Sequence, residues 1–189
     1  MAAKENQRIR MSKHMLKDSL ISLLHEKSIH KISVREICDD AQVNRTTFYK
    51  YYGSQYDLLE GIESEFLLNI DRYLGQSSDE TDLDRLKKVL TYALNNLDLC
   101  RLLFTNNVDP EFPGRLISLP RIPEMLSQFL ADGYDGDELK YISGFIVHGG
   151  YSMIKQWINK EKPEPPEMIA SLLAGTISRL FPVNAALKA

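Results

Sequence analysis

Residues 33–57 contain three signals that each mark the start of a helix. Their close spacing leaves room for only two short helices between the first signal and the third. Ser33 is followed three residues later by Glu36, the pairing of a capping box in which each side chain binds the backbone N–H of the other residue. Asn44 is a favourable N-cap for the next helix. Ser54 and Asp57 then repeat the capping pattern. The segment therefore predicts a short helix, a tight turn, a second short helix and the start of a third.

The rest of the chain also has helical patterning. Apolar residues recur at three- and four-residue spacing, and no strand-like alternation, internal repeat or low-complexity tract interrupts them. The polar stretch QSSDETD, residues 76–82, is the clearest break, and DPEFPGRLISLPRIP is punctuated by Pro and Gly. We expect an all-α fold of about nine helices: a first of about five turns ending near residue 28, then 33–42, 44–52, 54–75, 83–97, 99–106, 122–132, 138–160 and 167–181.

Two short helices joined by three or four residues, with longer helices before and after, have helix-turn-helix geometry. In such a unit the second short helix lies in the DNA major groove, so its outward face needs donors and its inward face needs apolar anchors. The sequence NRTTFYKYY, starting at Asn44, divides in this way. Val43, Phe48 and Tyr52 share the face that we expect to pack inward.

The remaining side chains of this stretch offer hydrogen-bond donors for a DNA duplex. We expect Arg45, Thr46 and Thr47, at the start of the helix, to reach base edges, because arginine can bind guanine and threonine offers a hydroxyl and a methyl group. The side chains that follow suit phosphate oxygens, which fix register without reading sequence. These residues are Tyr49, Lys50 and Tyr51.

The charge distribution agrees with a DNA-binding N-terminal part. Residues 1–57 hold ten Lys and Arg against seven Asp and Glu, whereas the remainder holds thirteen against nineteen. A basic N-terminal part followed by an acidic remainder is typical of a DNA-binding protein with a separate regulatory domain. The alternative is an uneven surface charge with no partner.

Several function classes are not indicated. No apolar run approaches the roughly 20 residues of a membrane helix, and MAAKENQRIRMSK has no secretory-signal pattern. The two cysteines lack metal-ligand spacing, and a reduced cytosol is the default compartment, so we expect a cytoplasmic protein. Motifs of hydrolases, metalloproteases and phosphate-binding loops are missing from the sequence. We expect no enzyme activity, no cofactor and no metal.

The stretch SVREICDDAQVNRTTFYKYYGSQYDLL resembles the DNA-binding segment of the TetR family of bacterial transcription regulators, and the likeness covers about residues 10–60. The positions that match the family's pattern are Ser33, Ile37, Ala41, Val43, Asn44, Thr47, Phe48, Tyr49, Tyr52, Ser54, Asp57 and Leu58. The resemblance implies a DNA contact at Arg35, for which the alternative is a solvated arginine paired with Asp39. Asn44 is included among the expected DNA-binding residues.

The chain departs from the family's pattern at two positions. Gln55 stands where the family usually has a lysine that touches phosphate, so one ionic contact is lost although a hydrogen bond can still form. Gln42 replaces the glycine of the turn, which implies either a strained backbone or a turn that does not need positive φ.

The C-terminal region is similar to one TetR subgroup, which includes a regulator of dihydroxyacetone kinase genes that works with a kinase-related protein partner. The matching positions are Gly149, Ile154, Trp157, Ile158, Pro166, Glu167 and Ala170. Mid-helix glycines at 149 and 150 suggest the close approach of another helix, because each costs about 1 kcal/mol against alanine. The family resemblance implies a homodimer formed through the last two helices.

Other residues near the C-terminus and Cys38 are expected in the core. The surroundings of His148 are almost continuously apolar, so we expect a hydrogen-bonded core histidine, with a polar contact to an effector as the alternative. We also expect Phe145 and Trp157 to be core residues, and Cys38 to be a small buried hydrophobe.

Together these patterns predict a dimeric transcription regulator that binds a two-fold symmetric DNA operator. Residues 1–53 would form the helix-turn-helix domain and residues 54–189 an effector-binding and dimerisation domain, with 54–75 as the linking helix. An unknown small molecule would modulate binding; the alternative is a co-regulator whose C-terminal domain binds a protein partner. The sequence does not identify the operator, the target genes, the effector or the sign of regulation.

Overall fold

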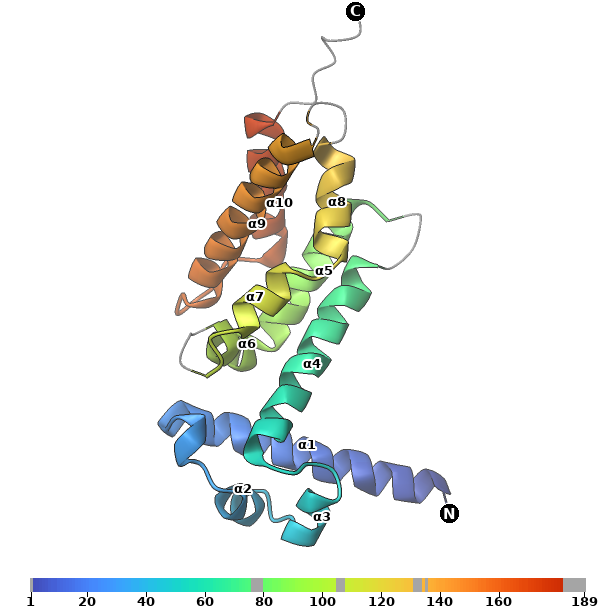
Figure 1. The fold of residues 1–189 in the computed structure, drawn as a ribbon, viewed down its shortest axis with the longest axis vertical. Helices are drawn as coiled ribbons and strands as arrows, with labels where there is room; N and C mark the ends of the chain where they lie inside the picture. Colours follow the sequence, from blue (N-terminus) through green and yellow to red (C-terminus); the bar gives the residue numbers. More distant parts are fainter. Residues whose placement is uncertain (1, 76–79, 105–107, 131–133, 135, 182–189) are drawn as a thin grey trace, which may run out of the picture. The chain divides into compact units, whose positions relative to one another are not determined.

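The chain is built from α-helices throughout the described residues. The computed structural model describes residues 2–75, 80–104, 108–130, 134 and 136–181, and these contain ten α-helices, one short 3-10 helix (Ile29–Lys31) and no strand (Figure 1), which confirms the all-α fold. The α-helices are α1 (Ala2–Glu26), α2 (Val34–Asp40), α3 (Arg45–Tyr49), α4 (Gln55–Leu74), α5 (Asp82–Asn95), α6 (Leu97–Phe104), α7 (Phe112–Ile117), α8 (Arg121–Leu130), α9 (Gly136–Ile158) and α10 (Pro166–Leu180).

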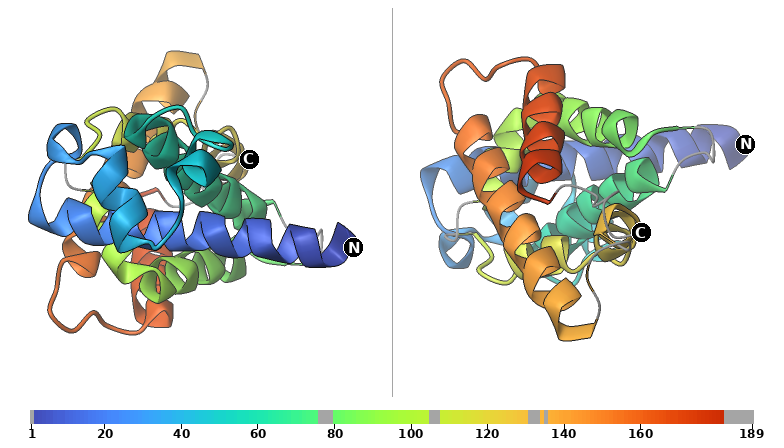
Figure 2. Two further views of the ribbon diagram at one scale, coloured as in Figure 1. Left: turned by 90° about the horizontal axis from the view of Figure 1, so that it is seen from below. Right: turned by 90° about the horizontal axis from the view of Figure 1, so that it is seen from above.

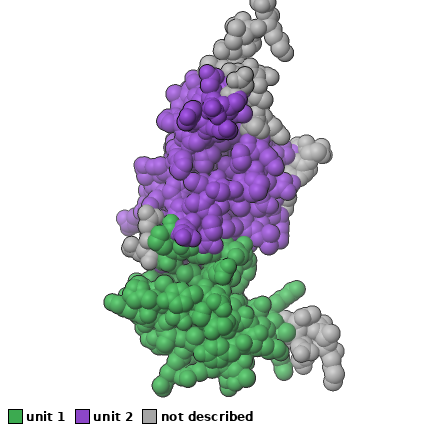
Figure 3. Space-filling model, viewed as in Figure 1, with its two compact units in different colours: residues 1–66, 105–110 green, residues 67–104, 111–189 purple. Residues whose placement is uncertain are grey.

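The helices divide into two compact units (Figure 3). The first comprises residues 1–66 with 105–110, and the second comprises residues 67–104 with 111–189. Helix α4 begins in the first unit and ends in the second, without an interruption in its helical backbone.

Each helix of the first unit contributes to its core. Leu16 of α1, Ile37 of α2, Phe48 of α3 and Leu58 of α4 expose none of their surface. The buried Ser19 hydroxyl of α1 donates to the carbonyl of Ile37 at 3.1 Å, so the polar group inside this core has a partner. Helix α2 packs against both α1 and α3, which fixes the position of the second short helix.

The predicted capping box begins α2. The backbone N–H of Glu36 donates to Ser33 Oγ at 3.2 Å, and the backbone N–H of Ser33 donates to Glu36 Oε2 at 2.9 Å. Hydrogen bonds from the Lys27 ammonium, and then from Ser33, lower the pKa of Glu36 from 4.5 to about 2. The carboxylate therefore stays ionised, and the charge-assisted cap holds, at any pH well above 2.

In the second unit, α10 packs against α5 and α9 (Figure 2, right). The guanidinium group of Arg101 on α6 closes the C-terminal end of α9: its Nε donates to the carbonyl of Ile158 at 2.8 Å and its Nη2 to the carbonyl of Lys160 at 2.7 Å. The indole N–H of the buried Trp157 donates to the carbonyl of Glu164 at 2.9 Å. The arginine bonds satisfy carbonyl groups that the end of α9 would otherwise leave unpaired, and the indole bond holds the segment that follows.

A guanidinium group also covers the C-terminal end of α4. Arg121 Nε of α8 lies 3.3 Å from Asp71 Oδ2. A Cβ atom built at Gly75, the residue after α4, would lie 2.4 Å from Arg121 Cζ, so the missing side chain makes room for the guanidinium. This arrangement ties the end of α4 to α8.

Three helix boundaries differ from the prediction. Helix α1 starts at Ala2, so the charged N-terminal residues extend it well beyond the expected five turns. Helix α3 ends at Tyr49 instead of Tyr52, because the N–H groups of Tyr51 and Tyr52 both donate to the carbonyl of Phe48 at 2.9 Å and close a tight turn. Helix α7 forms where only a punctuated segment was expected, with a proline in its first turn, where proline is tolerated.

Parts of three predicted features lie outside the described residues. These are residues 76–79 of the polar break, 105–106 of the helix expected at 99–106, and 131–132 of the helix expected at 122–132.

The prediction that His148 and Phe145 lie in the core is wrong. His148 is exposed, and Phe145 exposes 65% of its surface. Only one side of α9 packs inward, where Ile146 joins Leu126 and Leu130 of α8 in a buried cluster. Trp157, by contrast, is buried as predicted. The apolar residues of α9 therefore lie on two faces of the helix. One face packs inside the unit, and the other is exposed.

Candidate DNA-binding surface

A strained residue forms the turn between α2 and α3. Gln42 has φ of 52°, the left-handed region that a side chain disfavours. The N–H of Val43 then donates to the carbonyl of Cys38 at 2.9 Å and closes the turn. Of the two alternatives for the missing turn glycine, the strained backbone is therefore the one observed. Cys38 is buried as predicted, and this burial raises the pKa of its thiol.

We expect the substitution Gln42→Gly to stabilise the protein. Removing the side chain from a left-handed backbone stabilises the folded state by about 1–2 kcal/mol. The larger backbone entropy of glycine in the unfolded chain lowers this gain by about 0.5–1 kcal/mol. The free energy of unfolding, measured by urea denaturation, should rise by about 0.5–1 kcal/mol. The side chain of Gln42 is exposed, so little contact is lost. Gln42→Ala is the matched control and should give no gain, and a glycine variant no more stable than the alanine variant contradicts the prediction.

The second short helix is held by its cap and one anchor. Asn44 caps α3, with Oδ1 accepting from the N–H of Thr46 at 2.8 Å. Phe48 is fully buried on the inner side. This arrangement confirms the predicted inward face, on which Val43 and Tyr52 are half-buried.

The aromatic side chains of the stretch brace one another. The ring centroid of Phe48 lies 5.6 Å from those of both Tyr49 and Tyr52, edge-on to the first. Tyr51 lies 6.5 Å from Tyr52 in an edge contact. Tyr49 nevertheless exposes 58% of its surface. A buried ring thus packs against an exposed phenol and restricts its direction.

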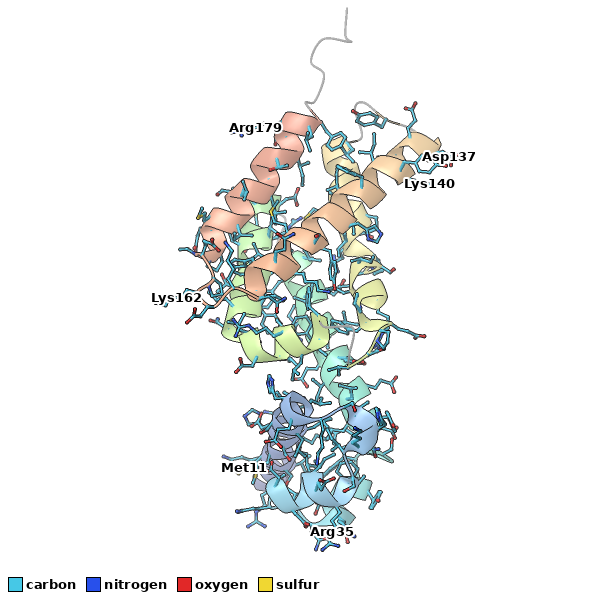
Figure 4. The ribbon with its side chains drawn as sticks, turned by 90° about the vertical axis from the view of Figure 1, so that its left-hand side faces the viewer. Met11, Arg35, Asp137, Lys140, Lys162 and Arg179 are labelled. Carbon is cyan, nitrogen blue, oxygen red and sulfur yellow. The ribbon has the colours of Figure 1, made fainter. Side chains whose placement is uncertain are left out.

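The structure places most of the predicted DNA-binding residues at the surface. Arg35, whose side chain projects from α2 (Figure 4), pairs with Asp39 through Nε and Oδ2 at 3.4 Å, and both side chains are largely exposed. An exposed pair of this kind is weak, so the arginine stays available to another anion. The exposed members of the set are Arg35, Asn44, Arg45, Thr46, Tyr49 and Lys50, and the half-buried members are Thr47, Tyr51 and Gln55.

The residues from Asn44 to Tyr51 are brought together on α3 and its C-terminal turn, whereas Arg35 belongs to α2 and Gln55 is the first residue of α4. The exposed ridge contains a guanidinium, an ammonium, hydroxyls and a phenol, all of which can donate hydrogen bonds to base edges or phosphates.

Sequence reasoning missed Lys13 of α1. Its Nζ atom lies 5.0 Å from the ring centroid of Tyr51 and 5.9 Å from that of Tyr52. Within the pattern of α1 this lysine resembles any solvated helix charge, and no local signal connects it with a ring on another helix. Only the tertiary packing brings it to the end of α3.

The described residues offer no other obvious chemistry. No group of three His, Cys, Asp or Glu side chains in them could hold a metal ion. None of the helices searched has the length and apolar character that crossing a membrane requires.

A short capped helix with an exposed donor-rich face, packed on a helix that precedes it through a tight turn, defines a helix-turn-helix DNA-binding protein. Residues 18–62 match the family described as "Bacterial regulatory proteins, tetR family", and residues 80–179 match "Transcriptional regulator C-terminal region". The chain belongs to the TetR family of transcription regulators, with a DNA-binding and a C-terminal regulatory domain, and it is not an enzyme.

A sequence relative and a solved structure that resemble this chain are also transcription regulators by name. The uncharacterised HTH-type transcriptional regulator YxbF of Bacillus subtilis (strain 168) is 26% identical over 73 residues, which span 39% of this chain and 19% of that protein. A TetR transcriptional regulator from Streptococcus agalactiae 2603V shares the fold, with a TM-score of 0.67, 24% identity, and coverage of 94% of this chain and 99% of that one.

A second solved structure carries a more specific name. The dihydroxyacetone kinase operon activator DhaS has a TM-score of 0.63 and 18% identity, with 90% of this chain and 96% of that chain covered. At these identities both structures establish the fold alone. The predicted membership of the TetR family is confirmed, and its structural relatives include the dihydroxyacetone kinase operon regulator.

Proposed function

We propose that this regulator binds a two-fold symmetric operator as a homodimer, with α3 in the major groove of each half-site. The observation that carries the proposal is the exposed, donor-rich ridge of α3 above the buried Phe48. In this proposal Arg45, Thr46 and Thr47 read base edges, and the other contacts fix register on the phosphates. The latter come from Arg35, Asn44, Tyr49, Lys50, Tyr51 and Gln55. If the protein binds an operator, it acts in the bacterial cytoplasm, where the chromosomal DNA lies.

An exposed apolar face on α9 and α10 supports dimerisation. Tyr141 and Phe145 of α9 expose 80% and 65% of their surfaces, and Met168 and Leu172 of α10 expose 57% and 50%. On each helix the two residues are four apart, so each pair shares one helical face. A face of this kind marks an interface, and a second copy of the chain fits the two-fold operator that we propose.

The glycines of α9 agree with this interface. A Cβ atom built at Gly149 would meet no atom within 4 Å among the described residues, so no helix of the same chain explains this glycine. At Gly150 the nearest atom is Leu173 Cδ2, at 3.8 Å, an ordinary contact. A partner helix that approaches closely at Gly149 would account for the cost of glycine inside a helix.

We also propose that a small molecule bound in the C-terminal domain modulates DNA binding by tilting α4. Among the described residues the buried hydroxyl of Tyr151 on α9 has no hydrogen-bond partner, and the Tyr151 ring stacks on Phe104 at 5.3 Å between centroids. Burial raises the pKa of Tyr151, so the phenol stays a neutral donor. A ligand with an acceptor group would satisfy it, which favours a small molecule over the alternative of a protein partner.

The operator itself can be found by selecting genomic fragments that the purified protein retains, and the neighbouring genes then indicate the signal.

With the selected duplex, Tyr49→Ala should weaken binding at least tenfold, because a fixed phosphate contact is lost. Fluorescence anisotropy measures the affinity, and circular dichroism checks that the helical content persists. Tyr49→Phe keeps the ring and removes only the hydroxyl, so it separates the hydrogen bond from the packing. Undiminished binding by Tyr49→Ala refutes the role of this residue.

A further inference from the structure

Two ammonium groups from different helices approach one tyrosine ring at the end of α3. Lys13 Nζ of α1 lies 5.0 Å from the Tyr51 ring centroid, and Lys50 Nζ lies 5.9 Å from the same centroid. Lys13 lies on α1, whereas Tyr51 lies in the turn that follows α3. The contact joins residues that are far apart in the sequence, so the packing of α1 against the helix-turn-helix creates it.

Three lysine and arginine side chains of the first unit already have a carboxylate partner, unlike these two lysines. Lys17 pairs with Glu65, Lys27 with Glu36 and Arg35 with Asp39. Neither Lys13 nor Lys50 forms an ion pair within the described residues. Both lie over the Tyr51 ring, and Lys13 also lies near the Tyr52 ring. A cation over an aromatic ring that solvent still reaches gains only about 0.5–1 kcal/mol, and two like charges near one ring repel each other. A bound anion would remove that repulsion.

We propose that Lys13, Lys50 and Tyr51 together contact the phosphate backbone of the DNA, with each lysine paired to a phosphate of its own. The inference rests on the proposed binding of DNA through α3, and it adds α1 to the DNA-binding surface. Each ammonium group can pair with a phosphate, and the phenol can donate to a phosphate oxygen. The ring also limits the freedom of the Lys13 side chain before DNA arrives, so less conformational entropy is lost on binding.

A phosphate contact has a signature that a base contact lacks. The logarithm of the binding constant falls with the logarithm of salt concentration by about 0.9 for each phosphate neutralised. In the proposed dimer Lys13→Gln occurs in both subunits, so we expect it to make this slope shallower by about 2. It should also weaken binding to the selected duplex and to an unrelated duplex of equal length by the same factor. Discrimination between the two duplexes should therefore stay constant.

Two variants control for charge and for folding. Lys31 is exposed, whereas Lys13 is half-buried, and it too forms no ion pair within the described residues. Lys31→Gln therefore removes the same charge from the unit and should leave the slope unchanged. Lys13→Arg keeps the cation and should retain the slope of the unaltered protein. Circular dichroism and thermal unfolding verify that each variant is folded.

The outcomes separate this inference from the proposed function. If Lys13→Gln keeps the original slope, or if it changes discrimination between the duplexes, the phosphate contact is wrong while operator binding stands. If Lys31→Gln flattens the slope as much as Lys13→Gln, the effect comes from net charge and the inference also fails. If the unaltered protein binds no duplex at low salt, both the function and the phosphate contact are refuted.

Discussion

Replacing Leu172 with glutamate is expected to convert the proposed dimer into a monomer and to weaken operator binding at least a hundredfold. Leu172 exposes 50% of its surface on α10, beside Met168, so the change should not disturb the core of its own unit. In a two-fold interface the substitution occurs twice, and each new carboxylate would have to lose its water in an apolar contact. A monomer can engage only one half-site, which forfeits the second set of contacts.

Analytical ultracentrifugation measures the oligomeric state of this variant, and anisotropy with the selected duplex measures its affinity. Leu68→Glu provides a matched control, because Leu68 is an exposed leucine, at 58%, on α4 instead of α10. The control should stay dimeric and bind DNA normally. A Leu172→Glu protein that sediments as a dimer rules out this face of α10 as the interface.

Phe48→Ala is expected to lower the free energy of unfolding by about 3–5 kcal/mol and to abolish operator binding. Phe48 is fully buried, and its ring contacts those of Tyr49 and Tyr52, so truncation leaves a cavity beneath α3 and removes the brace of the exposed phenol. Urea denaturation followed by circular dichroism measures the loss.

The matched variant of Phe48 is Phe48→Leu, which fills most of the volume and should cost about 1.5 kcal/mol or less. It should retain weakened DNA binding, because α3 stays anchored while Tyr49 loses its aromatic neighbour. An alanine variant that keeps normal affinity would mean that the position of α3 does not depend on this anchor.

The local features of the first unit could be predicted because their causes are local. The Ser33–Glu36 box and the Asn44 cap depend on residues two or three apart, and both form as expected. The Lys13 contact could not be predicted, since no periodicity connects it with Tyr51. At Gln42 the sequence left two alternatives open, because a side chain does not reveal whether its backbone is strained.

The C-terminal errors have a different physical origin. Hydrophobic patterning indicates that a residue avoids water, but not whether its own chain or another one covers it. Phe145 belongs to an apolar helix and was assigned to the core, yet it is exposed within the chain. Its neighbour Ile146 has the same character and is buried. The direction of each side chain around α9 depends on how α8 and α10 pack, which the sequence pattern alone does not fix.

The end of α4 has a mechanical consequence. A helix of 20 residues is about 30 Å long, and α4 contains no proline that would let it hinge. The ion pair between Arg121 and Asp71, and the absence of a side chain at Gly75, fix the C-terminal end of α4 to α8. A displacement of α8 would therefore move the last turn of α4 with it, because the guanidinium of Arg121 holds the two helices together at that point.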